Sequence, residues 1–253
     1  MKRLWAAFAA IGILSLGACA SDVQMDKTAD APKFKEYTNV IDFDAMKALA
    51  VIPTREDVMI IDARPKKRRF DVGHIPGAVS IPDTFFAKMT DKLPADKGTR
   101  LVYYCGGFKC ALSHKSAYKA EALGYTNIAV YAGGEPEWKA KGELLSMSAT
   151  HLKKLMDKKE SKVVVIDSRP TRGRYKKGHI PGAINIPDTF FAKMTDKLPT
   201  DKSTPLVFYC QGPKCPLSTK SAIKAKALGY TNVMVFQGGY PEWVAAFGEG
   251  AKG

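Results

Sequence analysis

Two pairs of cysteines could carry the chemistry of this chain, and both pairs have the same spacing. Cys105 and Cys110 lie in the segment YCGGFKCALS, and Cys210 and Cys215 lie in the segment YCQGPKCPLS. A cysteine thiolate is a nucleophile and a metal ligand, and two neighbouring thiols can close a disulfide. The cysteines therefore leave nucleophilic catalysis, redox chemistry, a structural disulfide and metal binding open.

Metal binding is the least favoured of these uses. Each pair offers two thiolates, whereas a closed zinc site needs four ligands, and no C-x2-C pair accompanies them. We therefore expect neither a metal nor any other cofactor.

The cysteine pairs belong to a long internal repeat. An offset of 105 residues relates Cys105 to Cys210 and holds without a gap between residues 58–138 and residues 163–243. The segment IPDTFFAKMTDKLP occurs unchanged in both copies. Because a repeat of this length is a whole domain, the chain is expected to hold two tandem copies of one domain.

Each copy alternates short apolar runs with stretches of helical character. The expected strands of the first copy are 58–61, 79–81, 101–104 and 128–131, and the expected helices are 44–50, 84–92 and 113–123. Continuous apolar runs of this length are typical of buried parallel strands. Gly124 and Gly229 stand where a helix would end. The pattern predicts an α/β fold in each domain, with a mostly parallel central sheet and helices on both faces.

The first cysteine of each pair follows a strand directly, at the sheet edge where α/β proteins bind ligands. The following helix, which we expect Ser113 and Ser218 to cap, would point its free amides at the loop. The loop glycines can turn further amides inward, and the loop lysines add positive charge. These candidate substrate-binding residues are Gly106, Gly107, Lys109, Gly212 and Lys214. Such a loop should lower the pKa of a thiol and receive an anion.

Several further motifs recur in the same order in both copies. In the first copy they are Asp62-Ala63-Arg64, GHIPGA at 73–78, Leu123-Gly124-Tyr125, and Gly133-Gly134 followed by Trp138. Together with the strand and cysteine loop, they make the chain resemble the rhodanese-like sulfurtransferases over nearly all of residues 40–245. The resemblance implies that a loop cysteine takes sulfane sulfur from a donor such as thiosulfate and becomes a persulfide. The persulfide would then pass its sulfur to cyanide or a thiol.

By position, Cys105 and Cys210 match the nucleophile of that family. Two departures stand out. The serine after the nucleophile follows by eight positions instead of six, and each loop carries a second cysteine, Cys110 or Cys215. We expect the second cysteine to act as a resolving or redox partner, with a structural disulfide and an inert thiol as the alternatives. A branch of the family that uses a loop arginine for phosphate is excluded, because Ala111 and Pro216 occupy that position.

Residues outside the cysteine loops have simpler expected roles. Asp62 and Asp167 should bond loop backbone or pair with the arginines that follow them, and Trp138 and Trp243 should anchor the core. Basic runs precede GHIPGA in both copies, at 66–69 and at Arg172, Arg174, Lys176 and Lys177. These runs either draw in anions or form a solvated cationic surface.

The N-terminus reads as an export signal. Lys2 and Arg3 precede an apolar run at 4–16, which is too short to span a bilayer, and the segment ends in Leu-Gly-Ala-Cys19. This ending resembles a bacterial lipobox, which implies lipidation of Cys19. The expected segments are a lipoprotein signal peptide at 1–19, a tether at 20–38, a linker at 139–144 and domains at 39–140 and 145–247. The expected address is the cell envelope, anchored by lipid and facing the periplasm, with the outer membrane favoured.

The formal charge is +14, from 39 Lys and Arg against 25 Asp and Glu, and no nucleic-acid motif accompanies it. We therefore expect a small anionic sulfur or chalcogen substrate, with a thiol or a thioredoxin-like reductant as the second partner. The leading hypothesis is an exported sulfurtransferase. The alternatives are a dithiol-dependent reductase of a selenite-type oxyanion and a non-enzymatic sulfur carrier docked to an envelope redox complex.

Overall fold

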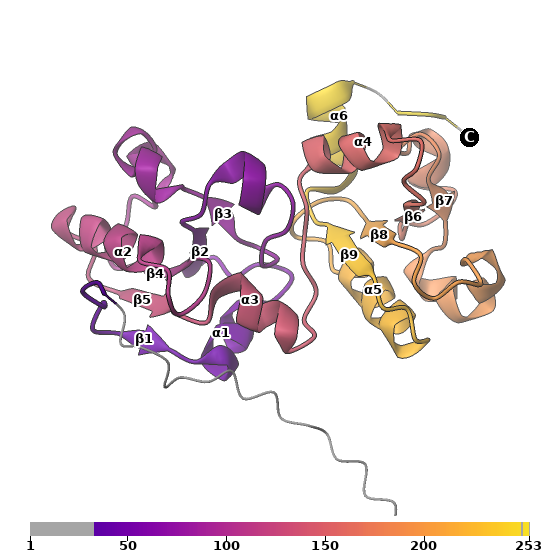
Figure 1. Ribbon diagram of the computed structural model, residues 1–253. Coiled ribbons are helices and arrows are strands. Elements are labelled where there is room, and N and C mark those ends of the chain that lie inside the picture. Colours follow the sequence, from indigo (N-terminus) through magenta and orange to yellow (C-terminus); the bar gives the residue numbers. More distant parts are fainter. Residues whose placement is uncertain (1–32, 249, 253) are drawn as a thin grey trace, which may run out of the picture.

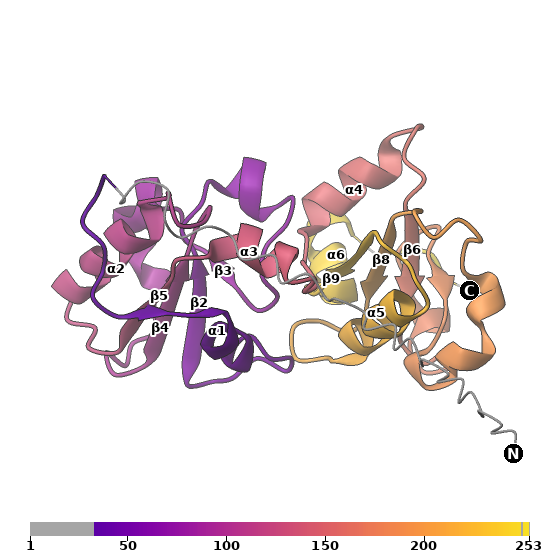
Figure 2. The same cartoon turned by 60° about the horizontal axis from the view of Figure 1, so that its bottom comes forward.

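The computed structural model describes residues 33–248 and 250–252, so the expected signal peptide, Cys19 and most of the tether lie outside the described residues. Two α/β domains lie side by side, joined by the segment between α3 and α4 (Figures 1 and 2). Both sheets are parallel, with the strand orders β1-β5-β4-β2-β3 and β7-β6-β8-β9. The predicted fold class is confirmed.

The first domain runs from β1 to α3. Its strands are β1 (Val40–Ile41), β2 (Val58–Asp62), β3 (Val79–Ser80), β4 (Arg100–Tyr104) and β5 (Ile128–Tyr131). Its helices are α1 (Phe43–Leu49), α2 (Leu112–Ala122) and α3 (Gly134–Ala140), with a π-helical turn η1 (Lys66–Phe70) and the 3-10 helices η2 (Asp83–Lys88) and η3 (Thr90–Lys92).

The second domain repeats this order from α4 to α6. Its strands are β6 (Val164–Asp167), β7 (Ile184–Asn185), β8 (Leu206–Tyr209) and β9 (Val233–Phe236). Its helices are α4 (Ala149–Asp157), α5 (Leu217–Ala227) and α6 (Gly239–Phe247), with the 3-10 helices η4 (Tyr175–Lys177), η5 (Asp188–Lys193) and η6 (Thr195–Lys197).

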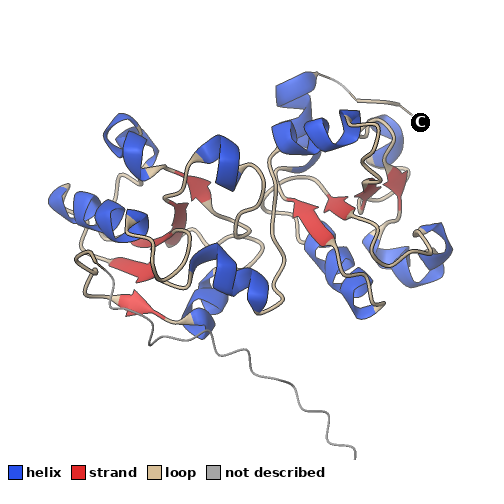
Figure 3. Ribbon diagram, in the orientation of Figure 1, coloured by secondary structure: helices blue, strands red, loops and turns tan. Residues whose placement is uncertain are grey.

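Strand β4 shows why both faces of the sheet are covered, as Figure 3 shows for the whole molecule. Leu101 and Tyr103 pack with α2 and η2 on one face, whereas Val102 and Tyr104 pack with α1 and α3 on the other. Alternate side chains of a strand point to opposite faces, so an all-apolar strand needs a helical layer on each. The helices thereby fix the carboxyl end of β4, where the cysteine loop begins.

The segment after α3 pairs with β9 of the second sheet and also contacts the first domain. Leu145 and Met147 bond the backbone of Val235 in β9 at 2.9 and 3.0 Å, at the sheet edge that β1 occupies beside β5. Ser146 exchanges backbone bonds of 2.9 and 2.8 Å with His74 of the first domain. Helix α3 also reaches Ala140, so it occupies the first part of the expected linker. The connection between the domains is therefore hydrogen-bonded to both of them.

Two local expectations were wrong. A single helix was expected over 84–92, but non-helical backbone at Met89 (φ −131°, ψ 20°) divides that stretch into two 3-10 helices. Ser113 and Ser218 were expected to cap helices, but α2 and α5 begin one residue earlier, at Leu112 and Leu217. The two serines lie inside the first turn, where their hydroxyls point at the cysteines.

Candidate active site

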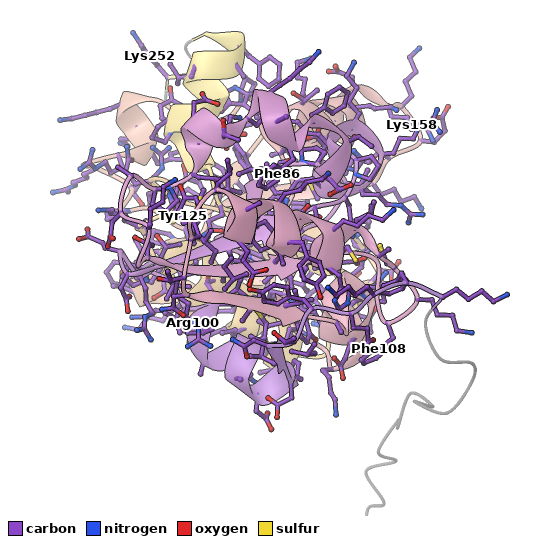
Figure 4. All side chains as sticks on the ribbon, turned by 90° about the vertical axis from the view of Figure 1, so that its left-hand side faces the viewer. Phe86, Arg100, Phe108, Tyr125, Lys158 and Lys252 are labelled. Atoms are coloured by element: carbon purple, nitrogen blue, oxygen red, sulfur yellow. The ribbon has the colours of Figure 1, made fainter. Side chains whose placement is uncertain are left out.

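The two cysteine loops, residues 105–111 and 210–216, each connect the carboxyl end of a central strand to the helix that covers it. In Figure 4, Arg100 at the start of β4 and Phe108 in the first cysteine loop lie on opposite sides of the domain. The loop is thus held at the sheet edge where ligands bind in parallel α/β folds.

A glycine on the neighbouring turn holds each loop from behind. Gly134 has φ +60°, and a Cβ atom there would lie 2.3 Å from the carbonyl oxygen of Cys105. Gly239 has the same relation to Cys210, with φ +62° and 2.3 Å. No side chain fits such a close approach. The second glycine of each Gly-Gly motif therefore lets the cysteine loop pack against this turn.

The first cysteine of each loop points into the protein. Cys105 and Cys210 have no exposed surface. Cys105 Sγ lies 3.1 Å from the carbonyl oxygen of Cys110 and 3.1 Å from Ser113 Oγ. Cys210 Sγ has the same partners, Cys215 O at 3.0 Å and Ser218 Oγ at 3.2 Å. Contact with the second cysteine and then burial raise the pKa of Cys105 and Cys210 well above the ordinary value.

The second cysteine of each loop lies among groups that stabilise a negative charge. Cys110 is half-buried; its carbonyl oxygen accepts a hydrogen bond from the Cys105 thiol at 3.1 Å, and its Sγ accepts from the amides of Gly106 and Leu112. Contact with the Cys105 thiol, those amides and the Arg64 charge outweigh burial and lower the pKa of Cys110 to about 6. Cys215 matches this pattern, and its pKa is also lowered to about 6.

These findings reverse one electrostatic expectation. A lowered pKa was expected for Cys105 and Cys210, but it is found for Cys110 and Cys215. The prediction that backbone amides surround the loop sulfur atoms agrees with the structure, in which the amide of Gly106 donates to Cys110. Both sulfur atoms receive amides, because the amide of Ser113 donates to Cys105 and those of Gly106 and Leu112 donate to Cys110. The nucleophilic role of Cys105 and Cys210 stays a prediction. All four of these cysteines are free thiols.

A buried arginine lies beside each loop. Arg64 donates to both carboxylate oxygens of Asp62, at 2.6 to 3.0 Å, and to the carbonyl oxygen of Gly73 at 2.7 Å. Arg169 makes the same bonds to Asp167 and Gly178. The expected pairing of these residues is confirmed. Each arginine thereby ties the strand end to the GHIPGA segment and adds positive charge near the second cysteine.

Comparison with known proteins agrees with this geometry. The sequence model of the family described as "Rhodanese-like domain" matches residues 46–141 and 148–246. The chain belongs to the rhodanese-like family.

Its relatives include a thiosulfate sulfurtransferase of Gallus gallus, 25% identical over 72% of this chain and 82% of the relative. A 3-mercaptopyruvate sulfurtransferase of Escherichia coli K12 is 24% identical over 75% of this chain and 90% of the relative. Among solved structures, a thiosulfate sulfurtransferase from Pseudomonas aeruginosa matches with a TM-score of 0.36 and 22% identity. That match covers 82% of this chain and only 42% of the other.

The two rhodanese-like domains differ at the mouth of the site. In the first domain, Glu135 Oε2 accepts a bond of 2.9 Å from Arg64, so two carboxylates surround that arginine. The repeat replaces Glu135 by Tyr240, whose ring lies 4.5 Å from the Arg169 guanidinium. Arg169 donates instead to the neutral Gln211, at 3.2 Å. The second domain therefore keeps more uncompensated positive charge.

A cavity of 380 Å³ opens at this place in the second domain. It is lined by Arg169, Gly173, Arg174, Lys177, Gly178, Gln211 and Tyr240. Arg174 and Lys177 belong to the basic run that precedes GHIPGA in the second copy, whereas the first copy has Val72 at the position of Lys177. Sequence reasoning missed Gln211, Glu135 and Tyr240, although the loss of charge between copies at 135 and 240 was a visible signal.

The loop lysines lie farther out. Lys109 and Lys214 are exposed, and Lys214 pairs with Glu56 of the first domain at 3.1 Å. His74 of the GHIPGA segment is structural: its Nδ1 lies 2.8 Å from the Phe70 carbonyl oxygen, and its ring stacks on Phe70. Burial lowers the pKa of His74 to about 4, so the imidazole is neutral at physiological pH.

Within residues 33–248 and 250–252, no group of three or more His, Cys, Asp or Glu side chains could hold a metal ion. The same part of the chain contains no helix with the length and apolar character needed to cross a bilayer.

Proposed function

We propose that the chain is a sulfurtransferase that moves sulfane sulfur from a thiosulfate-like anion to a thiol or cyanide, through a cysteine persulfide in each rhodanese-like domain. The observation that carries the proposal is the cradle itself: a half-buried thiolate receives two backbone amides beside a buried arginine. A site that stabilises a sulfur anion suits both the attacking thiolate and the persulfide that it becomes.

The chemistry balances without a cofactor. The cysteine thiolate attacks the outer sulfur of thiosulfate, a new S–S bond forms, and the old S–S bond breaks with its electron pair on sulfite. An acceptor thiolate or cyanide then attacks the outer sulfur of the persulfide and releases the cysteine thiolate. By position in the family the sulfur-bearing thiol is Cys105 or Cys210, with Cys110 or Cys215 beside it in the same loop.

The anionic donor is proposed to bind at the cavity of the second domain, where Arg174 and Lys177 face it. The relatives named for thiosulfate and 3-mercaptopyruvate support a donor of this size and charge. The first test is release of thiocyanate from thiosulfate and cyanide by the full chain. A variant with all four loop cysteines changed to alanine should lose that activity, and unchanged turnover in it would contradict the proposal.

A second candidate is a dithiol reductase of a selenite-type oxyanion. The contact between the two cysteines of each loop favours it, because neighbouring thiols can close a disulfide and deliver two electrons. A thioredoxin-like dithiol would then have to reduce the disulfide. Redox titration of each pair separates the candidates: a reversible two-electron disulfide that follows oxyanion turnover supports the reductase.

We further propose that the protein is exported and anchored by lipid on Cys19. The lipobox-like ending and the short apolar run before it support this address. Intact-mass measurement of the mature protein should show a chain that begins at Cys19 with added acyl groups. Cys19→Ala should leave the protein unlipidated, and an unchanged mass and membrane association of that variant would exclude the anchor.

A further inference from the structure

The glutamine directly after β9 connects the second cysteine loop to the first domain. Gln237 keeps only 5% of its surface exposed. Its Oε1 accepts a hydrogen bond of 2.6 Å from the amide of Gly77, in the GHIPGA segment of the first domain. Its Nε2 donates a bond of 3.3 Å to the carbonyl oxygen of Pro213, in the middle of the second cysteine loop. One buried side chain thus bonds the loop of one domain and the backbone of the other.

The two partners leave the side-chain amide of Gln237 a single orientation. A backbone N–H only donates and a backbone carbonyl only accepts, so Oε1 must face Gly77 and Nε2 must face Pro213. The backbone amide of Gln237 donates in turn to the hydroxyl of the buried Ser146, at 3.2 Å, in the connection between the domains. A carboxylate or an apolar side chain of the same length could not make both side-chain bonds.

Other contacts of this loop with the first domain are weaker. Lys214 pairs with Glu56 at 3.1 Å, but these side chains are 77% and 87% exposed, so solvent screens the pair and it adds little. Cavities of 510 and 610 Å³ border the loop toward the first domain, at Pro213 and at Pro216, so close packing is interrupted at both prolines. The bonds of Gln237 are therefore the ones expected to fix the loop against the first domain.

The first copy has different residues at both ends of this connection. Ala132 stands at the position of Gln237, and Phe108 stands at the position of Pro213. The alanine side chain has no polar atom, so it can bond neither a loop nor another domain. The support of the two cysteine loops is therefore unequal, although the neighbouring Gly-Gly turn approaches both in the same way.

We infer that Gln237 is a positioning residue of the second sulfur-transfer site, and that it makes the first domain part of the support of that site. The inference rests on the proposed function for its reaction, whereas the connection between loop and domain stands on the hydrogen bonds alone. A loop held from two sides keeps its cysteines in one arrangement while donor and acceptor bind in turn, and a displacement of an ångström can cost a reaction about 100-fold.

The same substitution can be tested in two chains that differ in which loop is active. One chain keeps the second loop and carries Cys105→Ala and Cys110→Ala, and the other keeps the first loop and carries Cys210→Ala and Cys215→Ala. Gln237→Met removes both side-chain bonds at nearly constant volume. We expect kcat for thiocyanate release, counted per site that loads a persulfide, to fall at least roughly fivefold in the second-loop chain. The first-loop chain with Gln237→Met is the control and should keep its kcat.

Gln237→Glu separates the bond to the loop from the bond to the first domain. A carboxylate still accepts from the Gly77 amide but cannot donate to the Pro213 carbonyl oxygen, so the second-loop chain with this variant should also lose activity. Full activity of Gln237→Glu would show that the bond to Pro213 plays no part, and it would overturn the inference.

Hydrogen exchange followed by mass spectrometry gives a readout that does not depend on turnover. The Cys215 amide bonds the Gly212 carbonyl oxygen at 2.9 Å within the loop, so its exchange reports how well the loop is held. In Gln237→Met with all four loop cysteines present, peptides that cover residues 210–216 should exchange faster. Peptides that cover the matching residues 105–111 should keep their rate.

Unchanged kcat of Gln237→Met in an active second-loop chain, whatever its exchange rates, would overturn the inference. Equal losses in the two chains would overturn it as well, because Gln237 would then act through general stability. If neither parent chain transfers sulfur, the proposed function fails on its own. Faster exchange confined to residues 210–216 would then still support the connection through Gln237, and unchanged exchange there would reject it.

Discussion

At the scale of single residues, we expect the sulfur-transfer activity to be lost at acidic pH. Cys110 and Cys215 have pKa values lowered to about 6, first by contact with the neighbouring thiol and then by loop amides. A thiolate nucleophile works while it is deprotonated, so activity is full above the lowered pKa and is lost as the pH falls through it. We expect kcat/KM for thiosulfate to be flat from pH 7 to 8 and to halve near pH 6.

The measurement is a pH profile of sulfite release with saturating acceptor, controlled by circular dichroism to show that the fold persists at each pH. An acid limb centred near the pKa of a free cysteine, about 8.5, would contradict the lowered pKa of Cys110 and Cys215. The neutral His74 gives no competing limb in this range, because burial lowers its pKa to about 4.

The Asp–Arg pair gives a second prediction at this scale. Arg64→Met would leave the fully buried Asp62 without its partner, which should destabilise the protein by about 3–5 kcal/mol. Urea unfolding followed by circular dichroism measures the loss. Arg55→Met is the matched control, because it removes an exposed pair with Asp57, and we expect it to leave the unfolding midpoint unchanged. Equal midpoints for the two variants would show that the buried pair does not stabilise the domain.

At the scale of elements, the turn after β5 sets the shape of the cysteine loop. Gly134→Ala combines a left-handed φ of +60° with a Cβ atom 2.3 Å from the Cys105 carbonyl oxygen, so the loop must move. We expect sulfur transfer by the first domain to fall at least roughly tenfold, since amides displaced by an ångström no longer hold the sulfur anion. Activity of the first domain is measured in a chain with the cysteines of the second loop changed to alanine.

Gly124→Ala is the control for backbone strain without contact. Gly124 also has a positive φ, +87°, but a Cβ atom there would meet nothing within 4 Å. It should cost stability by about 1–2 kcal/mol and leave kcat/KM unchanged. Equal loss of activity in both variants would mean that general destabilisation, and not the approach to Cys105, limits the reaction.

The elements also show what could be predicted from sequence. The apolar runs at 58–61 and 101–104 predicted β2 and β4 to within a residue, because all-apolar runs of that length bury both faces of a parallel sheet. Loop position follows from strand position, so the cysteines were placed at the correct edge. The directions of Cys105 and Cys110 could not be predicted, because a helix that starts one residue earlier turns Ser113 from a cap into a partner of Cys105.

At the scale of the whole molecule, duplication has produced two sites of unequal charge. Arg64 is bonded to Asp62 and Glu135, whereas Arg169 is bonded to Asp167 and the neutral Gln211. Lys177 adds a further charge at the mouth of the second site, where the first domain has Val72. A pair of domains with one nucleophile each can thus differ in donor affinity while they share a reaction. Copy number alone gives no reason to expect equal activity.

Exchanging these residues should move donor affinity between the domains. In chains that keep one active loop, Lys177→Val in the second domain should raise the KM for thiosulfate several-fold, with little change in kcat, because a charge outside the reacting atoms mainly aids binding. Glu135→Gln in the first domain should lower its KM. The Lys177 effect should shrink as salt rises from 10 mM to 0.5 M, since the exposed charge of Lys177 is screened. Lys153→Met, which removes an exposed charge of α4 that does not line the cavity, is the control. Equal KM values for the two single-domain chains, or a Lys177→Val shift that persists in high salt, would show that charge at the mouth does not distinguish the sites.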